Sequence, residues 1–311
     1  MSALKASLRD YLAFRRALGF KLITEQRLLE RFVQFAASAG ATFITTELAL
    51  KWVNQEDDTP PGHRAGRLAV LRRWARFASA TDPRTIVPPE DLLPSRRRRI
   101  APYLFTDKEI HALIAAARAL PSSSGLRPHT YVTLIGLYAA TGLRAGEALR
   151  MDRDDVDLVE GILQIRESKF GKSRLVPVHA STCRALRRYA EDRDRIFPRP
   201  RSPSFFLSER GTRLSYDVVW LTFRALGRQV GLRTPPGLRA PRIYDLRHRF
   251  AITTLTHWHR RGADVTRRLP QLSTYMGHSS VANTYWYLTA TPALLRYALR
   301  RAERCAPGVR P

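Results

Sequence analysis

Residues 140–147 read Ala-Thr-Gly-Leu-Arg-Ala-Gly-Glu. The apolar run before them, Tyr131 to Ala140, predicts a helix that Gly142 ends. Glu147 follows Arg144 by three positions, so both side chains lie on one face of the next helix, where a local ion pair is the simplest interpretation. The stretch therefore predicts two helices that meet at Gly142.

The sequence on both sides of this stretch predicts a mainly α-helical domain with one small β-sheet. Upstream, Thr106 and Glu109 fit a capping box that starts a helix. Downstream, residues 161–167 and 173–178 favour β-strands, and residues 169–172 (Lys-Phe-Gly-Lys) join them as a hairpin. Helical patterns dominate again from residue 215 onward. We assign this domain to residues 104–311.

Residues 1–83 predict a separate helical domain. Apolar positions at helical spacing indicate four short helices. The last, Arg64 to Phe77, has an apolar stripe and a basic face that carries Arg67, Arg72, Arg73 and Arg76. Residues 84–103 are the predicted linker, because prolines exclude a long helix there. The linker carries a cationic run that is usually only solvated but here is placed to follow a phosphate backbone: Arg96, Arg97, Arg98 and Arg99.

The composition indicates a polyanionic partner. Lys and Arg number 53 against 27 acidic residues, a formal net charge of +26, which makes nucleic acid the default partner. A basic protein of an RNA particle, or an arginine-rich composition from a GC-biased genome, is the plainer alternative. Two cysteines, Cys183 and Cys305, make no disulfide framework, and no apolar run approaches the roughly 20 residues of a membrane span. We therefore expect a cytoplasmic protein.

Four short segments of the C-terminal domain match one pattern in order. They are residues 140–147, residues 168–174 (Ser-Lys-Phe-Gly-Lys-Ser-Arg), residues 244–248 (Tyr-Asp-Leu-Arg-His), and residues 276–280 (Met-Gly-His-Ser-Ser) followed by Tyr287. Together they resemble the catalytic domain of the tyrosine recombinase, or phage integrase, family. The N-terminal helices look like its core-binding, SAM-like domain, with less specific motifs. The resemblance implies a two-domain C-shaped clamp around duplex DNA.

The family has six catalytic positions, which the resemblance carries over to Arg144, Lys169, Tyr244, Arg247, His278 and Tyr287. Two guanidiniums suit a scissile phosphate, because they bind its oxygens with paired, charge-assisted hydrogen bonds. Asp245 looks like a helix N-cap, which places Arg247 in the first turn, where the helix dipole also favours a phosphate. In the family, His278 bonds the phosphate and the acidic residue at Glu147 supports the site.

A lysine in the hairpin is informative, because only six of the 53 cations are lysines. The leaving 5′ oxygen needs a proton, which lysine can release and arginine cannot. The resemblance sets Lys169 as this acid. Lys172 and Arg174 are expected to bind DNA.

The nucleophile can also be chosen without the family. If residues 280–289 form one helix, Tyr285 shares an apolar stripe with Val281, Ala282 and Leu288 and belongs to the core. Tyr287 then lies about 200° away and is free to meet DNA. The resemblance selects the same tyrosine, which implies a 3′-phosphotyrosine intermediate. No metal or other cofactor is implied.

Position 244 departs from the family pattern, which has histidine where this chain has Tyr244. The family's histidine is thought to handle the proton of the nucleophile, and a tyrosine with a pKa near 10 is a poor base at neutral pH. A binding-only accessory recombinase that has lost catalysis through Tyr244 is therefore one rival interpretation. A type IB topoisomerase, which uses similar chemistry without exchanging partners, is the second. Recombination by this family implies two DNA duplexes and four protomers, which are copies of this chain or of this chain and related recombinases. The resemblance also implies a location at the bacterial nucleoid and not at a membrane.

Overall fold

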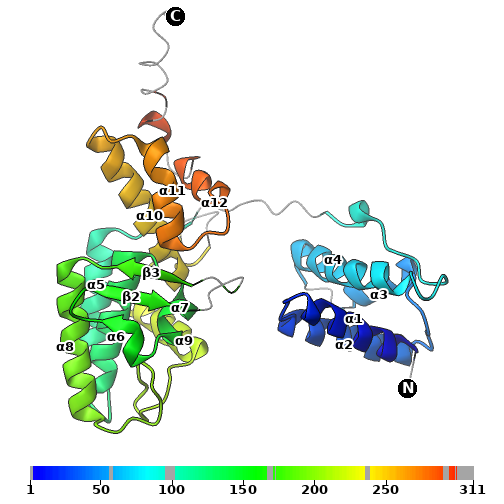
Figure 1. Ribbon diagram of the computed structural model, residues 1–311, viewed down its shortest axis with the longest axis horizontal. Helices are drawn as coiled ribbons and strands as arrows, with labels where there is room; N and C mark the ends of the chain where they lie inside the picture. The colour runs from blue at the N-terminus through cyan, green and yellow to red at the C-terminus, as the bar shows by residue number, and fades with distance from the viewer. Residues whose placement is uncertain are drawn as a thin grey trace, which may run out of the picture. The chain divides into compact units, whose positions relative to one another are not determined.

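The computed structural model describes residues 3–55, 59–94, 102–166, 171, 173–234, 239–289, 294–297 and 299. The chain divides into two compact units, residues 1–99 and 100–311, and each is described by itself. Both units are helical, and the second also holds a small sheet (Figure 1), which confirms the predicted fold class of mainly α with a small β-sheet. Within the described residues, no helix has both the length and the apolar character needed to span a membrane.

Four helices build the N-terminal unit, as the sequence predicts. They are α1 (Ala3–Ala17), α2 (Ile23–Ser38), α3 (Thr46–Val53) and α4 (Pro61–Ala78). The ring of Phe32 on α2 meets Trp52 on α3 and Trp74 on α4 edge-on, with centroids 5.2 and 5.9 Å apart. Phe32 and Trp74 are fully buried, so this aromatic contact joins three helices in one core.

Residues 84–94, which the sequence assigns to the linker, pack against the N-terminal unit and include the short 3₁₀ helix η1 (Glu90–Leu92). Arg72, expected on the basic face of α4, is buried. Its Nε donates to the carbonyl oxygen of Pro88 at 2.7 Å, and its Nη2 donates to that of Pro89 at 2.5 Å. Prolines make no helix here, so their carbonyls need other donors, and a buried guanidinium supplies them.

The C-terminal unit places helices around a three-stranded antiparallel sheet. The helices are α5 (Asp107–Arg118), α6 (Leu126–Thr141), α7 (Ala145–Arg150), the 3₁₀ turn η2 (Arg153–Asp155), α8 (Ala180–Ile196) and α9 (Tyr216–Gln229). The strands are β1 (Val156–Asp157), β2 (Ile162–Ile165) and β3 (Arg174–Pro177), in the order β1-β2-β3. Ile165 pairs with Arg174, so β2 and β3 form the predicted hairpin, while β1 was not predicted. The capping box of Thr106 and Glu109 is confirmed at the start of α5.

A last group of helices has its own apolar core. It consists of α10 (Ile243–Arg260), α11 (Val265–Met276), α12 (Ala282–Tyr285) and the 3₁₀ helix η4 (Trp286–Thr289), which lie next to one another in Figure 1. α10 also packs against α6. This packing brings the end of α11 to the turn between α6 and α7, which lies within residues 140–147.

The start of α10 differs from the expectation. The helix begins at Ile243, so Asp245 is its third residue and not its N-cap. The Asp245 carboxylate accepts the backbone N–H of Arg242 at 2.8 Å. Arg247 therefore lies in the second turn, and the prediction that it sits at the positive end of the helix dipole is wrong, because that field fades beyond the first turn.

Replacing Arg72 by Met is expected to lower the unfolding free energy of the N-terminal unit by about 1.5–3 kcal/mol, the usual value for hydrogen bonds from a charged group. Amide hydrogen exchange in residues 84–94 should rise, because the carbonyls of Pro88 and Pro89 lose their donor. Arg73→Met changes the exposed neighbour and is the matched control. Unchanged exchange in Arg72→Met would show that other contacts hold the segment.

Candidate active site

Three arginines bind the C-terminal end of α11. The carbonyl oxygens of residues 275, 276 and 277 each accept a hydrogen bond from a different guanidinium. The donors, in that order, are Arg174 Nε at 2.9 Å, Arg247 Nη2 at 2.8 Å and Arg144 Nη2 at 2.7 Å. The last carbonyls of a helix lack intrahelical partners and carry the negative end of its dipole, so cations suit them. Because the three carbonyls are consecutive, the predicted Arg144 and Arg247 lie close together.

Gly277 is required at this helix end for two reasons. Its φ of 70° lies in the left-handed region, which other residues rarely adopt. A Cβ at this position would also lie 2.5 Å from Nη1 of Arg174. The glycine therefore lets the guanidinium approach the turn that leads into His278.

Glu147 holds two of the three arginines. Its Oε1 lies 2.6 Å from Nη1 of Arg144, and both of its oxygens accept from Arg174, at 3.0 and 2.9 Å. Burial opposes ionisation of this carboxyl, but the hydrogen bonds and charge of Arg174, followed by those of Arg144, hold its pKa at about 2. The ion pair with Arg144 predicted from the three-residue spacing is present. Arg174 is a second partner that was not predicted from the sequence.

The two predicted phosphate-binding arginines keep donors to spare. A guanidinium carries five N–H groups. Arg247 uses one for Met276 and one for the carbonyl of Gly142 at 2.6 Å, and its buried Nε has no hydrogen-bond partner among the described residues. Burial, and then the charge of Arg144, lower the pKa of Arg247. An anion bound beside Arg247 would accept a hydrogen bond from this Nε and would reduce the repulsion between Arg144 and Arg247.

Tyr287 lies beside these arginines and is buried, with 2% of its surface exposed. Its hydroxyl oxygen lies 3.0 Å from Nδ1 of His248. Burial raises the pKa of Tyr287 to about 12, against the opposing charge of Arg247 and, more weakly, of Arg144. A buried phenol held next to two cations is protonated in the resting protein.

The locations predicted for Tyr285 and Tyr287 from a helical wheel are both wrong. Tyr285, expected in the core, is 49% exposed, whereas Tyr287, expected at the surface, is buried. The segment is not one α-helix: α12 ends at Tyr285 and continues as the 3₁₀ helix η4. A 3₁₀ helix brings residues three apart onto one face, and Thr284, three residues before Tyr287, is likewise buried.

His278 follows the glycine turn and lies next to Tyr287. The two rings are nearly parallel, with centroids 6.2 Å apart, and Nδ1 of His278 lies 2.7 Å from Oγ1 of Thr284. Burial, and then the charges of Arg247, Arg144 and Arg174, lower the pKa of His278 to about 4. The structure therefore brings His278 together with the arginines and Tyr287.

Position 244 contributes an exposed phenol. Tyr244 is 40% exposed and lies in the first turn of α10. One turn further along the same helix face lies His248, whose ring meets that of Tyr244 edge-on with centroids 4.9 Å apart. His248 belongs to the motif of residues 244–248, but no role was predicted for it from the sequence. The four-residue spacing from Tyr244 was the available signal.

Some of the predicted catalytic and DNA-binding residues lie outside the part of the chain that the structure describes. Lys169, Lys172, Arg96, Arg97, Arg98 and Arg99 lie outside the described residues. Arg174 is described, and its guanidinium is taken up by Glu147 and the carbonyl of Tyr275. No group of three or more His, Cys, Asp or Glu suited to a metal ion occurs in the described part of the chain.

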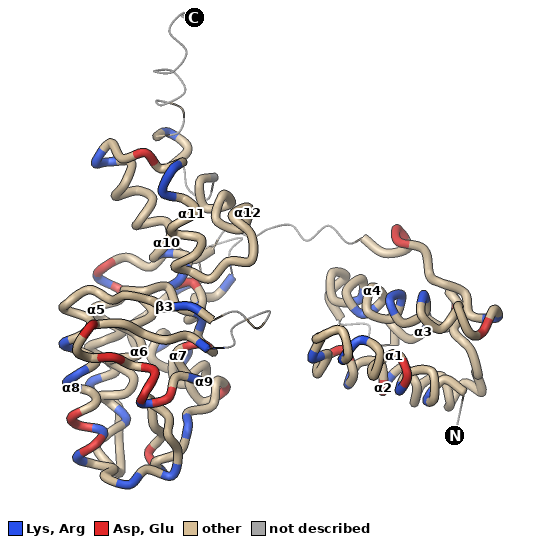
Figure 2. Tube along the Cα trace, viewed as in Figure 1, with Lys and Arg blue, Asp and Glu red and all other residues tan. Residues whose placement is uncertain are grey.

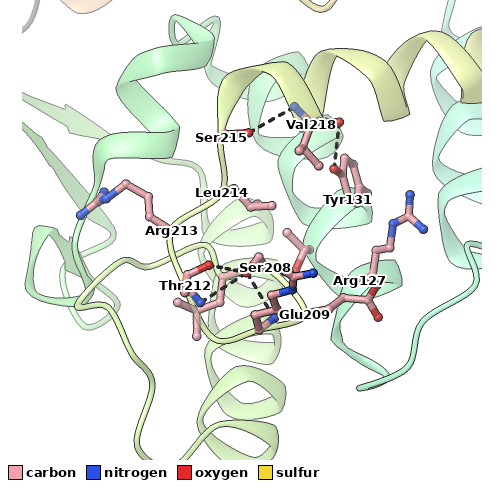
Figure 3. A pocket seen from close by; sticks show the side chains of 12 residues that line it. Arg127, Tyr131, Ser208, Glu209, Thr212, Arg213, Leu214, Ser215 and Val218 are labelled. Carbon is pink, nitrogen blue, oxygen red and sulfur yellow. Dashed lines mark hydrogen bonds between the residues drawn. The ribbon is translucent and has the colours of Figure 1, made fainter.

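A pocket of about 460 Å³ also lies in the C-terminal unit, where α6 and α9 begin near the loop of residues 207–215 (Figure 3). Its lining includes Arg127, Tyr131 and Glu209, and the hydroxyl of Tyr131 donates to the carbonyl of Val218 at 3.4 Å. None of the predicted catalytic or DNA-binding residues lines this pocket. The candidate site is therefore the cluster at the end of α11.

Replacing Glu147 by Gln is expected to lower the unfolding free energy by about 3–5 kcal/mol, because the arginines lose a buried counter-charge. In the wild type this contribution is present above pH 4.5, the ordinary pKa of the carboxyl, and is lost as the pH falls towards about 2, because protonation neutralises Glu147. Urea unfolding across this pH range measures both effects. Glu90→Gln removes an exposed partner of Arg76 and should change little. Equal stability of the wild type and Glu147→Gln at pH 7 would contradict the assignment.

Comparisons with known proteins agree with these features. Residues 104–293 match the model of the phage integrase family. The chain is 45% identical over 308 residues to the integrase/recombinase y4rB of Sinorhizobium fredii, across 98% of each chain. It is 32% identical over 238 residues to tyrosine recombinase XerD of Bifidobacterium longum, across 75% of this chain and 72% of XerD.

A solved structure shares the fold. The crystal structure of a lambda integrase tetramer bound to a Holliday junction superimposes with a TM-score of 0.63 at 19% identity, and the match covers 91% of this chain and 76% of that chain. The family match spans the helices and the hairpin that carry the arginines, the histidines and Tyr287. The chain therefore belongs to the phage integrase family, the tyrosine recombinases that carry out site-specific DNA recombination.

Proposed function

We propose that the protein cuts and rejoins duplex DNA at specific sites through a 3′-phosphotyrosine formed on Tyr287. The observation that carries the proposal is the pair of guanidiniums, Arg144 and Arg247, held on adjacent carbonyls next to that phenol. In-line attack on a phosphodiester places extra negative charge on the phosphoryl oxygens, and fixed cations stabilise that charge without reorganising. The unpaired Nε of Arg247 supplies one donor for those oxygens.

The proposed reaction stores the energy of the broken linkage. Attack by the Tyr287 oxygen joins the phosphate to the protein and breaks the bond from phosphorus to the 5′ oxygen, which takes a proton from Lys169 and leaves as a 5′-hydroxyl. A second DNA end reverses the step. No ATP is needed, because the phosphotyrosine ester conserves the bond energy. No metal ion is needed in this proposal, because Arg144 and Arg247 supply the positive charge on the phosphoryl oxygens.

Burial of Tyr287 implies that cleavage follows a rearrangement. A phenol that is 2% exposed does not meet a DNA phosphate from solvent. The segment that carries it consists of one short helix and one 3₁₀ turn, α12 and η4, which have few backbone hydrogen bonds to lose. In our proposal, phosphate binding to Arg144 and Arg247 competes with their bonds to the end of α11, and this segment shifts enough to expose the phenol while Tyr287 keeps its contact with α10.

Duplex DNA is the proposed partner of both units, which would enclose it as a clamp. The net charge of +26 favours this in a salt-dependent way. Helix α4 carries basic segments, drawn blue in Figure 2, and its Arg73 and Arg76 are exposed. Lys172 and the linker residues 96–99 are further proposed phosphate contacts. Recombination of two duplexes calls for four protomers, of this chain or of this chain with related recombinases.

Replacing Tyr287 by Phe should abolish the covalent protein–DNA adduct on a nicked duplex and leave DNA affinity unchanged, because only the nucleophilic oxygen is lost. Tyr285→Phe alters the exposed tyrosine two positions earlier and should keep the adduct. Gel analysis of denatured reactions measures the adduct, and a binding titration measures affinity. A wild-type protein that binds DNA but forms no adduct would establish the binding-only alternative.

Replacing Lys169 by Ala should slow cleavage by about 10² to 10⁴, the usual contribution of a general acid. A substrate with a bridging 5′ sulfur should restore most of the rate, because its leaving group needs no proton. Lys172→Ala is the control. It should weaken DNA binding, and the bridging sulfur should change its cleavage rate by the same factor as it changes that of the wild type. If sulfur fails to restore Lys169→Ala, Lys169 is only a phosphate contact.

A further inference from the structure

The proton of the Tyr287 hydroxyl needs an acceptor when the phenol attacks. Residue 244, the family's position for this task, is a tyrosine here and is 40% exposed. On α10, residues four positions apart lie on the same face about one turn from each other. His248 occupies that next turn, and its Nδ1 lies 3.0 Å from the Tyr287 oxygen. The helix thus presents an imidazole to the nucleophile from a position displaced by one turn.

The surroundings keep His248 neutral. Three aromatic rings, of Tyr244, Trp286 and Tyr287, lie against its imidazole, with centroids 4.9 to 5.5 Å away. Burial lowers the pKa of His248 to about 4, assisted by the charges of Arg242 and Arg247 and opposed by that of Asp245. At neutral pH the ring is therefore uncharged, and with its proton on Nε2 it accepts the Tyr287 O–H at Nδ1.

The other titratable groups at this place are already engaged. From the segment of residues 277–289, Tyr287 and His278 face His248. Nδ1 of His278 lies 2.7 Å from Oγ1 of Thr284, and the His278 ring lies parallel to that of Tyr287 and does not point Nδ1 at its hydroxyl. Nδ1 of His248 lies within hydrogen-bond distance of the nucleophilic oxygen and can accept its proton, whereas the neighbouring guanidinium of Arg247 can only donate.

We propose that His248 is the general base that removes the proton of Tyr287 during DNA cleavage, in place of the residue at position 244. The inference rests on the proposed function. As the bond from the Tyr287 oxygen to phosphorus forms, its O–H bond breaks and the proton passes to Nδ1 of His248. The bond from phosphorus to the 5′ oxygen breaks, and that oxygen takes a proton from Lys169. Rejoining runs the same transfers backwards, so the imidazolium returns its proton to Tyr287.

Binding of DNA improves the match between donor and acceptor. The resting phenol holds its proton far more tightly than the resting imidazole would. A phosphate between Arg144 and Arg247 adds negative charge, which favours the imidazolium and raises the pKa of His248. Proton transfer that accompanies bond formation to phosphorus also avoids a free phenolate. The base therefore gains strength when its substrate is in place.

Two substitutions of His248 separate proton transfer from positioning. His248→Asn keeps a hydrogen-bonding atom near the place of Nδ1 but cannot accept a proton, so adduct formation on a nicked duplex should slow by about 10² to 10⁴. His248→Ala should be equally slow, and added imidazole should restore part of its rate, more so at a pH where imidazole is neutral. Thermal unfolding and DNA affinity, measured for each variant, report folding and binding separately from chemistry.

Controls locate the effect on the nucleophile side of the reaction. A bridging 5′ sulfur should leave His248→Ala slow, although it restores Lys169→Ala, because the sulfur relieves only the leaving group. His111→Ala, which removes an exposed histidine of α5, should keep the wild-type rate with and without imidazole. Tyr287→Phe with imidazole should form no adduct.

The outcomes are distinct. A wild-type rate in folded His248→Asn overturns the inference, and so does a slow His248→Ala whose rate imidazole leaves unchanged. Either result leaves the proposed function intact, provided that the wild-type protein forms the adduct. Absence of an adduct in the wild type overturns the proposed function first.

Discussion

The candidate site depends on the C-terminal end of α11, where three consecutive carbonyl oxygens are bound by three guanidiniums. The arginines come from the turn before α7, from β3 and from α10, so a single helix end fixes elements that lie far apart in the sequence. Cations placed this close repel one another. Buried Glu147 offsets that repulsion for Arg144 and Arg174, and its low pKa measures how strongly the two stabilise its charge.

Arg247 lacks such a counter-charge, and this distinguishes it from the other two. It is almost fully buried, its pKa is lowered, and its Nε has no partner within the described residues. A cation in this condition is costly for the folded protein and becomes favourable when an anion arrives. The same location raises the pKa of the Tyr287 phenol and lowers those of two imidazoles. Burial thus keeps the Tyr287 phenol and the imidazoles of His248 and His278 uncharged at neutral pH.

Much of the architecture was predictable because it depends on local signals. The capping box at Thr106, the hairpin of β2 and β3, and the four N-terminal helices follow from residue spacing and from turn residues. Where local signals were ambiguous, the expectations failed. An aspartate such as Asp245 suits the third position of a helix as well as the N-cap, so its sequence position does not fix where the helix begins. The burial of Arg72 depends on contacts with Pro88 and Pro89, which lie 16 and 17 residues away and which local sequence patterns do not indicate.

The sequence by itself determined the family and the fold class, and it selected Arg144, Arg247 and Tyr287 as candidates, because ordered motifs such as residues 140–147 and 244–248 can be recognised without coordinates. Only the tertiary structure decided what each side chain contacts. Arg174 and Glu147 are 27 residues apart, and His248 and Tyr287 are 39 apart; no periodicity encodes such pairs. The exposure of Tyr285 and the burial of Tyr287 likewise depend on how α12 and η4 pack against α10 and α11, since a helical wheel shows which residues share a face but not which face meets the core.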